Sequence, residues 1–290
     1  MPNISVIWLQ NNDRKDKIYY RMLSERNEDT TKYLNPLVRS WLNMQINLVS
    51  CVFVLDNEKN DNIRKNDIKR LKVLLNDNNE LPKINIKQGN LKKQVKNNIS
   101  GIIGTSFFHL EQVYTMDYKD EIDIIYLGIT NIEYINKLQK GYKLVDFNIK
   151  DNSLILFDSK EYKYKTLEIV ENNNIEYIHK IKTNNFEVNR TLMNLLISYK
   201  KIRSNIDNTD IVFKFMGHSF TLEDVRMTYE LIRDCGVDKS NFRKKIIKYC
   251  EKVNETVDKK SGYRPSQRYK FKPLKGDVWL WFWQQIIMEN

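Results

Sequence analysis

The chain contains 290 residues, of which 41% are hydrophobic and 11% aromatic, and its formal net charge is +11. This length favours two domains, and the apolar content argues against a wholly disordered chain. The longest apolar runs are far shorter than the roughly 20 residues of a membrane span, and the first ten residues lack the pattern of a secretory signal. The three cysteines show no C-x-x-C spacing, which argues against a disulfide framework and a thiolate zinc site. We therefore expect an intracellular, cytoplasmic protein.

The first two thirds of the chain predict a mixed domain of strands and helices. A β-branched run at 48–55 is typical of a buried strand, and Leu91, Val95 and Ile99 have the four-residue spacing of one helix face. Gly104 is a suitable end for that helix. We predict strands at 48–55, 68–75, 107–114, 122–129 and 153–157, and helices at 91–103, 131–140, 162–172 and 190–202.

Residues 220–232 predict the first helix of a pair. Thr221 can cap this helix by accepting from the backbone N–H three residues on, and Asp224 supplies the reciprocal acidic group. The break at 234–237 contains the glycine that is expected between the helices of a helix-turn-helix. The apolar stripe of the first helix consists of Leu222, Val225, Tyr229 and Ile232.

A basic helix and a basic hairpin follow in that order. The helix is predicted at 241–249, with Asp238 or Ser240 as its cap, and the hairpin pairs 252–257 with 267–271. Helix, turn, helix and hairpin together predict a winged helix, whose second helix can enter the major groove of DNA. The inward face of the second helix is expected to consist of Phe242, Ile246 and Tyr249.

The positive charge of the chain is concentrated in this same region. Residues 239–275 contain thirteen Lys and Arg against three acidic residues, a local net charge of +10. Such a patch is typical of proteins that bind nucleic acid, and the alternative is a solvated charged face. We expect DNA contacts from Ser240, Asn241, Arg243, Lys244 and Lys248 on the helix, and from Lys259, Lys260, Arg264 and Arg268 on the wing.

Four segments together resemble the Nudix-related transcriptional regulators, a family that joins a Nudix-like domain to a winged helix. The most specific segments are Asp238-Lys-Ser-Asn-Phe-Arg-Lys-Lys and Gly262-Tyr-Arg-Pro-Ser-Gln-Arg-Tyr-Lys-Phe271, with 220–230 and the order of the upstream elements beside them. The resemblance covers about residues 46–275. It implies an α/β (α+β) Nudix-like domain with a C-terminal winged helix. The expected divisions are an N-terminal extension at 1–45, a degenerate Nudix-like domain at 46–185, a linker helix at 186–208, the winged helix at 209–275 and an aromatic tail at 276–290.

The resemblance also bears on catalysis. A working Nudix hydrolase carries a Gly-x5-Glu-x7-Arg-Glu-x-x-Glu-Glu-x-Gly box, whose glutamates hold divalent metals against a diphosphate. Aligned on Gly104, the Arg-Glu-x-x-Glu-Glu positions become Asn-Asn-Ile-Ser-Gly-Ile at 97–102, and no carboxylate lies between Lys83 and Thr105. We therefore expect no catalytic residue, no metal ligand and no enzyme activity.

The partners implied by the resemblance are double-stranded DNA and a second copy of the chain, with two recognition helices meeting two half-sites. The Nudix-like domain would sense an effector or mediate dimerisation, and a nucleotide such as ADP-ribose is the candidate effector. The unusually aromatic tail would pack against the Nudix-like domain or a dimer partner, or would anchor another protein. Two alternatives stay open: a scaffold whose winged helix binds RNA or another protein, and a hydrolase of an ADP-ribose-type nucleoside diphosphate.

Overall fold

The fold was obtained as a computed structural model of the full chain. It describes residues 45–58, 68–118, 121–150, 153–158, 160–165, 186–257 and 266–273. By its contacts the chain divides into two units, Met1–Gln45 and Ile46–Asn290, and the elements below belong to the second unit apart from the first residue of β1. Among the described residues, no helix is both long and apolar enough to cross a membrane.

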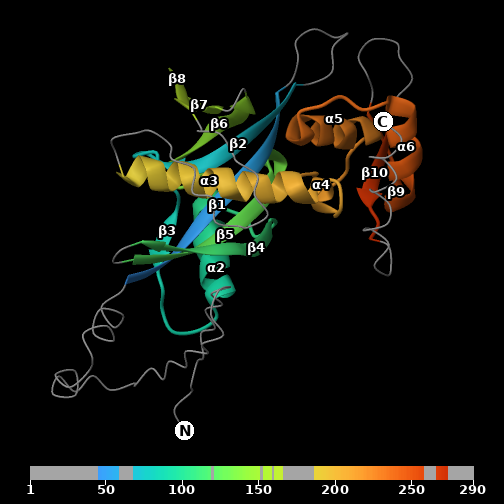
Figure 1. The fold of residues 1–290 in the computed structure, drawn as a ribbon. Coiled ribbons are helices and arrows are strands. Elements are labelled where there is room, and N and C mark those ends of the chain that lie inside the picture. Colours follow the sequence, from blue (N-terminus) through green and yellow to red (C-terminus); the bar gives the residue numbers. More distant parts are fainter. Residues whose placement is uncertain are drawn as a thin grey trace, which may run out of the picture. The chain divides into compact units, whose positions relative to one another are not determined.

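A sheet whose strands differ in length forms the first part of the described chain (Figure 1). Its strand order is β4-β5-β1-β2-β6-β7-β8, and the short β3 pairs with one end of β1. The long β1 lies between β5 and β2 in this order, and it pairs with β3 at Asn47 to Val49 and with β2 from Phe53 onward. The strands are β1 Gln45–Glu58, β2 Ile68–Asn76, β3 Lys83–Asn85, β4 His109–Tyr118, β5 Glu121–Asn131, β6 Tyr142–Lys150, β7 Ser153–Asp158 and β8 Lys160–Lys165.

Helix α2, Leu91–Ile103, packs on one face of this sheet and confirms the predicted helix. Asn90 caps its start by accepting from the Lys93 amide at 2.9 Å, and Gly104 ends it with a left-handed φ of 69°. A side chain at Gly104 would lie 3.1 Å from the Lys137 carbonyl oxygen. The inward residues of α2 join an apolar cluster with residues of β1 and β5. They are Val95, Ile99, Ile102 and Ile103.

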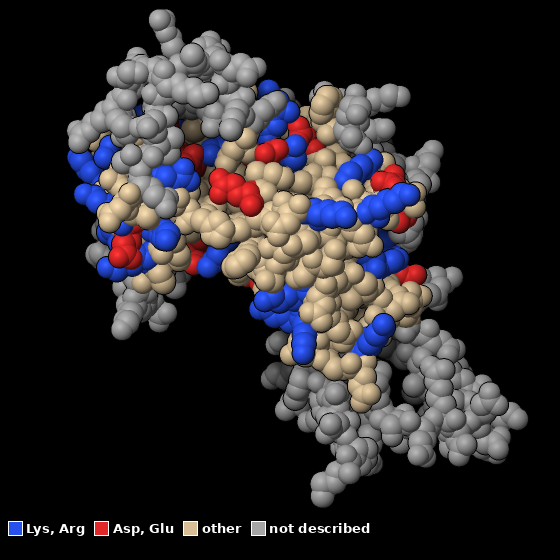
Figure 2. All heavy atoms as spheres, turned by 180° about the vertical axis from the view of Figure 1, so that it is seen from behind, with Lys and Arg blue, Asp and Glu red and all other residues tan. Residues whose placement is uncertain are grey.

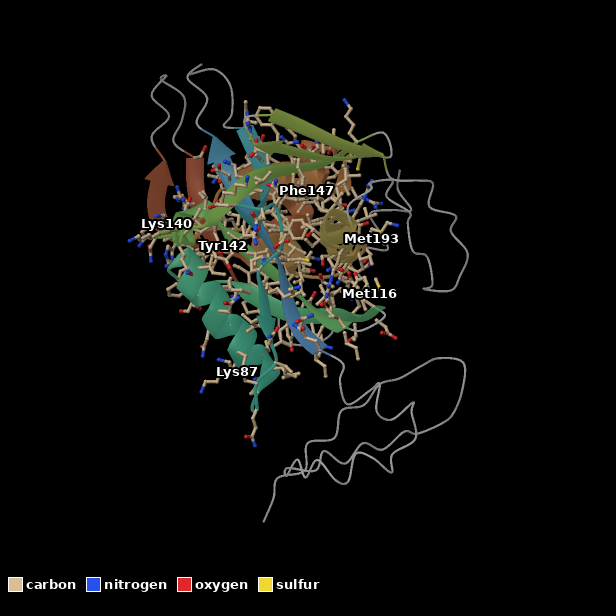
Figure 3. The ribbon with its side chains drawn as sticks, turned by 90° about the vertical axis from the view of Figure 1, so that its left-hand side faces the viewer. Lys87, Met116, Lys140, Tyr142, Phe147 and Met193 are labelled. Atoms are coloured by element: carbon tan, nitrogen blue, oxygen red, sulfur yellow. The ribbon has the colours of Figure 1, made fainter. Side chains whose placement is uncertain are left out.

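Helix α3, Phe186–Asn205, packs on the opposite face. Figure 3 shows α3, with Met193, and α2 on opposite sides of β1, and Met193 belongs to one buried cluster with Phe147 of β6. Both side chains are buried. Arg190 anchors the first half of α3, since its guanidinium donates to the fully buried Asp123 of β5 and pairs with Glu121 at 2.7 Å.

Between β5 and α3, the helix predicted at 131–140 is wrong, and the one predicted at 162–172 is wrong over its first four residues. Residues 131–140 contain only a 3₁₀ turn, η2 Ile132–Tyr134, because the following polar groups bond to the end of α2 instead of continuing a helix. The Gln139 backbone N–H donates to the Ile102 carbonyl at 2.8 Å, and the Asn136 side-chain amide donates to the Gly104 carbonyl at 2.9 Å. In the second region, 162–165 lie in β8, where pairing with β7 overrides the helical pattern, and 166–172 lie outside the described residues.

The segment 211–271, called the C-terminal module below, contains the predicted helix pair and hairpin. Its β9 and β10 are antiparallel, with a register shift between Gln267 and Tyr269. Phe220, just before the first helix of the pair, forms a bridge with Tyr269 and so ties that helix to the hairpin. The elements are α4 Ile211–Lys214, α5 Leu222–Arg233, α6 Lys239–Ile246, η3 Ile247–Tyr249, β9 Cys250–Val257 and β10 Ser266–Phe271.

The C-terminal module shares a core with the sheet and α3. One cluster of buried residues includes Phe53 of β1, Tyr199 of α3 and Ile232 of α5. Polar contacts cross the same boundary: the Tyr199 hydroxyl donates to the Ile232 carbonyl at 3.0 Å, and the Asn131 side chain donates to the Phe215 carbonyl at 2.7 Å. Helix α5 is therefore held against both the sheet and α3.

Candidate nucleic-acid interface

The first helix of the pair, α5, begins as predicted. Thr221 accepts from the Asp224 amide at 3.1 Å, and the Asp224 carboxylate accepts from the Thr221 amide at 2.8 Å, which completes a capping box. The Lys69 ammonium of β2 also donates to Asp224, at 2.7 Å. Burial by itself would raise the pKa of Asp224, but the Lys69 charge and the Thr221 hydrogen bonds hold that pKa below its ordinary value.

The turn between the two helices contains Gly236, as expected from the sequence. Its left-handed position is Asp234, with a φ of 59°. Asp is tolerated in this conformation because its short side chain can bond locally. The Glu230 carboxylate then accepts from the Val237 amide at 2.9 Å, which closes the turn onto α5.

The second helix, α6, begins two residues earlier than predicted. Asp238 caps it by accepting from the Asn241 amide at 2.8 Å, so Ser240 and Asn241 lie in its first turn, where both are exposed. The predicted inward face is confirmed. It consists of Phe242, Ile246 and Tyr249, all buried.

The predicted basic residues of α6 are exposed, but they lie on different sides of the helix. At about 100° per residue, Lys239 and Arg243 share the side next to the hairpin, and Ser240 and Lys244 share the outermost side. Lys248 follows in η3, with its ammonium 5.5 Å from the centre of the Tyr249 ring. Partial loss of hydration and the nearby Lys245 charge lower the pKa of Lys248.

A groove runs between α6 and the hairpin, with a cavity volume of about 710 Å³. The start of α5 also lines it, and the apolar part of the lining comes from Leu222 of α5, Phe242 of α6 and Tyr269 of β10. In Figure 2 basic side chains lie along the left-hand edge, on the side of the C-terminal module, and also along the right-hand edge, with acidic side chains among them. The lining residues are Thr221, Leu222, Glu223, Arg226, Lys239, Phe242, Arg243, Lys252, Ser266, Gln267 and Tyr269.

The predicted wing residues are only partly placed by the structure. Lys259, Lys260 and Arg264 lie outside the described residues. Arg268 is half-buried, and its guanidinium donates to the Ser219 hydroxyl at 2.7 Å, which directs it toward the segment before α5.

The groove includes residues that the sequence-based prediction missed. Lys239 and Lys252 belong to the basic run, and Lys239 stands four residues before Arg243, so helical spacing could have paired them. Nothing in the sequence pattern indicates that Gln267 of β10 faces the same space.

Helix α2 is the segment that aligns with the Nudix box in the sequence. The aligned glutamate positions are Asn98, Gly101 and Ile102, of which Ile102 is 2% exposed and packed in the apolar cluster. An amide, a hydrogen atom and an alkyl group cannot neutralise a divalent cation, so these residues do not fit a catalytic metal. Among the described residues, no group of three or more His, Cys, Asp or Glu is arranged to hold a metal ion.

Comparison with known families identifies the C-terminal module. Residues 212–271 match the NrtR DNA-binding winged helix domain. These bounds contain α5, α6 and the β9–β10 hairpin, so the predicted winged helix is confirmed. No curated protein matches the chain at a significant level.

Solved structures share the fold of the chain at low sequence identity. A MutT/nudix family protein from Enterococcus faecalis has a TM-score of 0.55 at 16% identity, over 87% of this chain and 100% of that one. Shewanella oneidensis NrtR in complex with a 27mer DNA has a TM-score of 0.54 at 11% identity, over 82% of this chain and 96% of that one. The same NrtR without DNA has a TM-score of 0.53 at 12% identity, over 79% and 94%. The predicted fold, a Nudix-like domain followed by a winged helix, is confirmed.

Proposed function

Because an NrtR-type winged helix follows a Nudix-like fold in this chain, we propose that the protein is a transcription regulator that binds double-stranded DNA. The proposed divisions are those expected from the sequence, with the Nudix-like domain at 46–185 and the winged helix at 209–275. Two copies would place two α6 helices on two half-sites of a near-palindromic operator. With DNA as its partner, the protein would act in the cytoplasm, at the nucleoid.

The observation that carries this proposal is the solvent-facing side of α6. Ser240, Asn241, Arg243 and Lys244 are exposed along a capped helix whose opposite side is anchored by Phe242 and Ile246. A helix presented in this way can enter the major groove and place polar and basic side chains at base edges. The related NrtR structure that contains DNA supports the same use of the domain.

The Nudix-like domain is proposed to act without hydrolysis. Its α2 lacks the carboxylates that a metal clamp requires, and the basic residues Lys92, Lys93 and Lys96 would repel a cation there. We therefore assign this domain to effector sensing or dimerisation, with a nucleotide such as ADP-ribose as the candidate effector. The aromatic tail at 276–290 lies outside the described residues, and its role in the dimer or in binding another protein stays a prediction.

The proposal is tested by duplex binding at two salt concentrations. The purified protein is titrated with the DNA upstream of its own gene, a scrambled duplex and a structured RNA. We expect preference for the upstream duplex and affinity that falls steeply with salt, because phosphate contacts release counterions. Arg243→Ala with Lys244→Ala should weaken binding at least tenfold, whereas Lys92→Ala with Lys93→Ala on α2, which removes the same charge, should not.

The other outcomes separate the alternatives. Binding to RNA or to no nucleic acid would contradict the DNA-binding proposal and support a scaffold. Magnesium-dependent release of product from ADP-ribose would contradict the non-catalytic assignment, because carboxylates elsewhere in the chain would then have to hold the metal.

A further inference from the structure

Three aromatic side chains form a cluster where loops of the Nudix-like domain meet the segment before α5. This aromatic cluster consists of Phe107 between α2 and β4, Tyr134 in η2, and His218 between α4 and α5. The Phe107 and Tyr134 rings are stacked with their centres 5.6 Å apart, and the Tyr134 and His218 rings are nearly perpendicular with their centres 4.5 Å apart. Phe107 is 63% exposed, and His218 is exposed as well. Three separate segments thus contribute rings to one patch of the surface.

The backbone beneath the aromatic cluster is held in place, although the rings themselves face solvent. Asn131, at the start of η2, donates to the Phe215 carbonyl at 2.7 Å, and the Glu133 carboxylate lies directly against Gly217. Phe107 has the highest exposed fraction of the large apolar side chains in the described part of the chain. Exposed aromatic rings that are gathered on a fixed support indicate an interaction surface, whereas single exposed apolar side chains do not.

The end of β10 leads back toward this cluster. Phe220 and Tyr269 exchange two backbone hydrogen bonds, of 2.9 Å and 2.7 Å, in an antiparallel bridge. Because the bridge is antiparallel, the chain beyond Tyr269 runs alongside the residues that precede Phe220. Phe271 and His218 are each two residues from the bridge, on the same side of it. The last residue described is Pro273, so the chain leaves the described part of the structure on the side that carries His218.

The tail that begins beyond this point is strongly apolar. Residues 276–290 lie outside the described residues, and their sequence includes Trp-Leu-Trp-Phe-Trp at 279–283. They contain two acidic residues and no Lys or Arg, a net charge of −2 in a chain of net charge +11. The link from Pro273 to Trp279 spans up to about 20 Å when extended, and a segment tethered so near a site has an effective concentration far above that of a second copy. Large apolar side chains gain free energy when they leave water, so the tail and the cluster suit each other.

We propose that the aromatic tail at 276–290 folds back on its own chain and packs its tryptophan side chains on the aromatic cluster of Phe107, Tyr134 and His218. Of the occupants that the sequence leaves open for the tail, this proposal selects the Nudix-like domain of the same chain. The packed tail covers the loop before β4, η2 and the segment before α5 together, and so ties the winged helix to the Nudix-like domain. The proposal requires neither DNA nor an effector, so it is tested separately from the proposed function.

Photo-cross-linking of the full-length protein tests which segment covers the cluster. The photoreactive p-benzoyl-phenylalanine replaces Phe107 in one sample, and in the control it replaces Phe157 of β7, which is also exposed, at 47%. We expect the probe at position 107 to link to 276–290 in protein that still runs as a monomer on a denaturing gel, and the probe at position 157 not to link to the tail. Tail links found only in the dimer band, links to 1–45 alone, or no links to the tail would overturn the proposal.

Proteolysis gives a second readout that requires no photoreactive group. Chymotrypsin cleaves after aromatic residues, of which the tail has four within 279–283. Phe107→Ser and His218→Ala, on two different segments, should each raise the rate of cleavage within 276–290 roughly fivefold or more, because the tail then spends more time unpacked. Phe157→Ser is the matched control, with no change expected. Wild-type cleavage rates in both cluster variants, or an equal increase in the control, would contradict the proposal.

Discussion

Lys69 is the residue through which the sheet meets the start of α5. Its side chain is 5% exposed, and its ammonium donates to Asn57 of β1 and to Asp224, each at 2.7 Å. Asp224 is also the reciprocal residue of the capping box, and its neighbours Leu222 and Glu223 line the groove. A lysine of the Nudix-like domain therefore fixes the end of the helix that borders the proposed DNA site.

We predict that Lys69→Met lowers the free energy of unfolding at neutral pH by about 1–3 kcal/mol, because Asp224 loses its charged partner. The pKa of Asp224 is lowered in the folded protein, so its contribution is fully present above about pH 4 and is lost as the pH falls through the lowered pKa. The difference between variant and wild type should therefore shrink in acid. Urea unfolding at several pH values measures it, with the exposed Lys93→Met as control, and a constant difference would contradict the prediction.

At the scale of elements, α2 ends at a glycine that its surroundings require and contains another that they do not. Gly104 has a φ of 69° and packs against the backbone of Lys137, with 3.1 Å and 3.2 Å to an added side-chain carbon. Gly101 lies within the helix, is exposed, and has nothing within 4 Å of such a carbon. The same substitution should thus act in opposite directions three residues apart.

Gly104→Ala is expected to destabilise the protein by about 1–2 kcal/mol, because alanine is strained in the left-handed conformation and meets the Lys137 backbone. Gly101→Ala should stabilise it by roughly 0.5–1 kcal/mol, since alanine loses less backbone entropy in a helix. Thermal unfolding of the two variants beside the wild type checks both signs. If the unfolding temperatures of both variants shifted equally and in the same direction, the left-handed conformation and close packing described for Gly104 would be contradicted.

At the scale of the molecule, the described part of the second unit has two apolar clusters, one on each side of the sheet. The larger one extends without interruption from β1 through α3 to α5, α6 and β10. Among the described residues the winged helix therefore shows no separate core, because its inward residues Tyr229 and Phe242 belong to the same cluster as Phe53 of the sheet. Shared burial of this kind couples the unfolding of the parts that contribute to it.

We predict that the Nudix-like and winged-helix parts unfold together. Hydrogen exchange of backbone amides in β5 and in α5, followed across a urea series, should give the same midpoint, because neither part retains its core alone. A lower midpoint for α5 than for β5 would show that the winged helix opens as a unit of its own.

The sequence determined the local structure of this protein where short-range interactions decide it. The capping box at Thr221, the inward face of α6 and the end of α2 all depend on residues within one or two helical turns, so pattern and residue type predicted them. The absence of carboxylates between Lys83 and Thr105 and the basic run at 239–275 are likewise properties of the sequence itself.

Only the tertiary structure decided the features that depend on distant residues. Residues 131–140 are not a helix because their polar groups bond to the end of α2, and 162–165 form a strand because β7 lies beside them. Lys69 reaches a carboxylate 155 positions away, and Lys252 and Gln267 join Arg243 only because the hairpin folds back beside α6. Spacing along the chain carries the period of a helix or strand, but it carries no information about which surfaces meet.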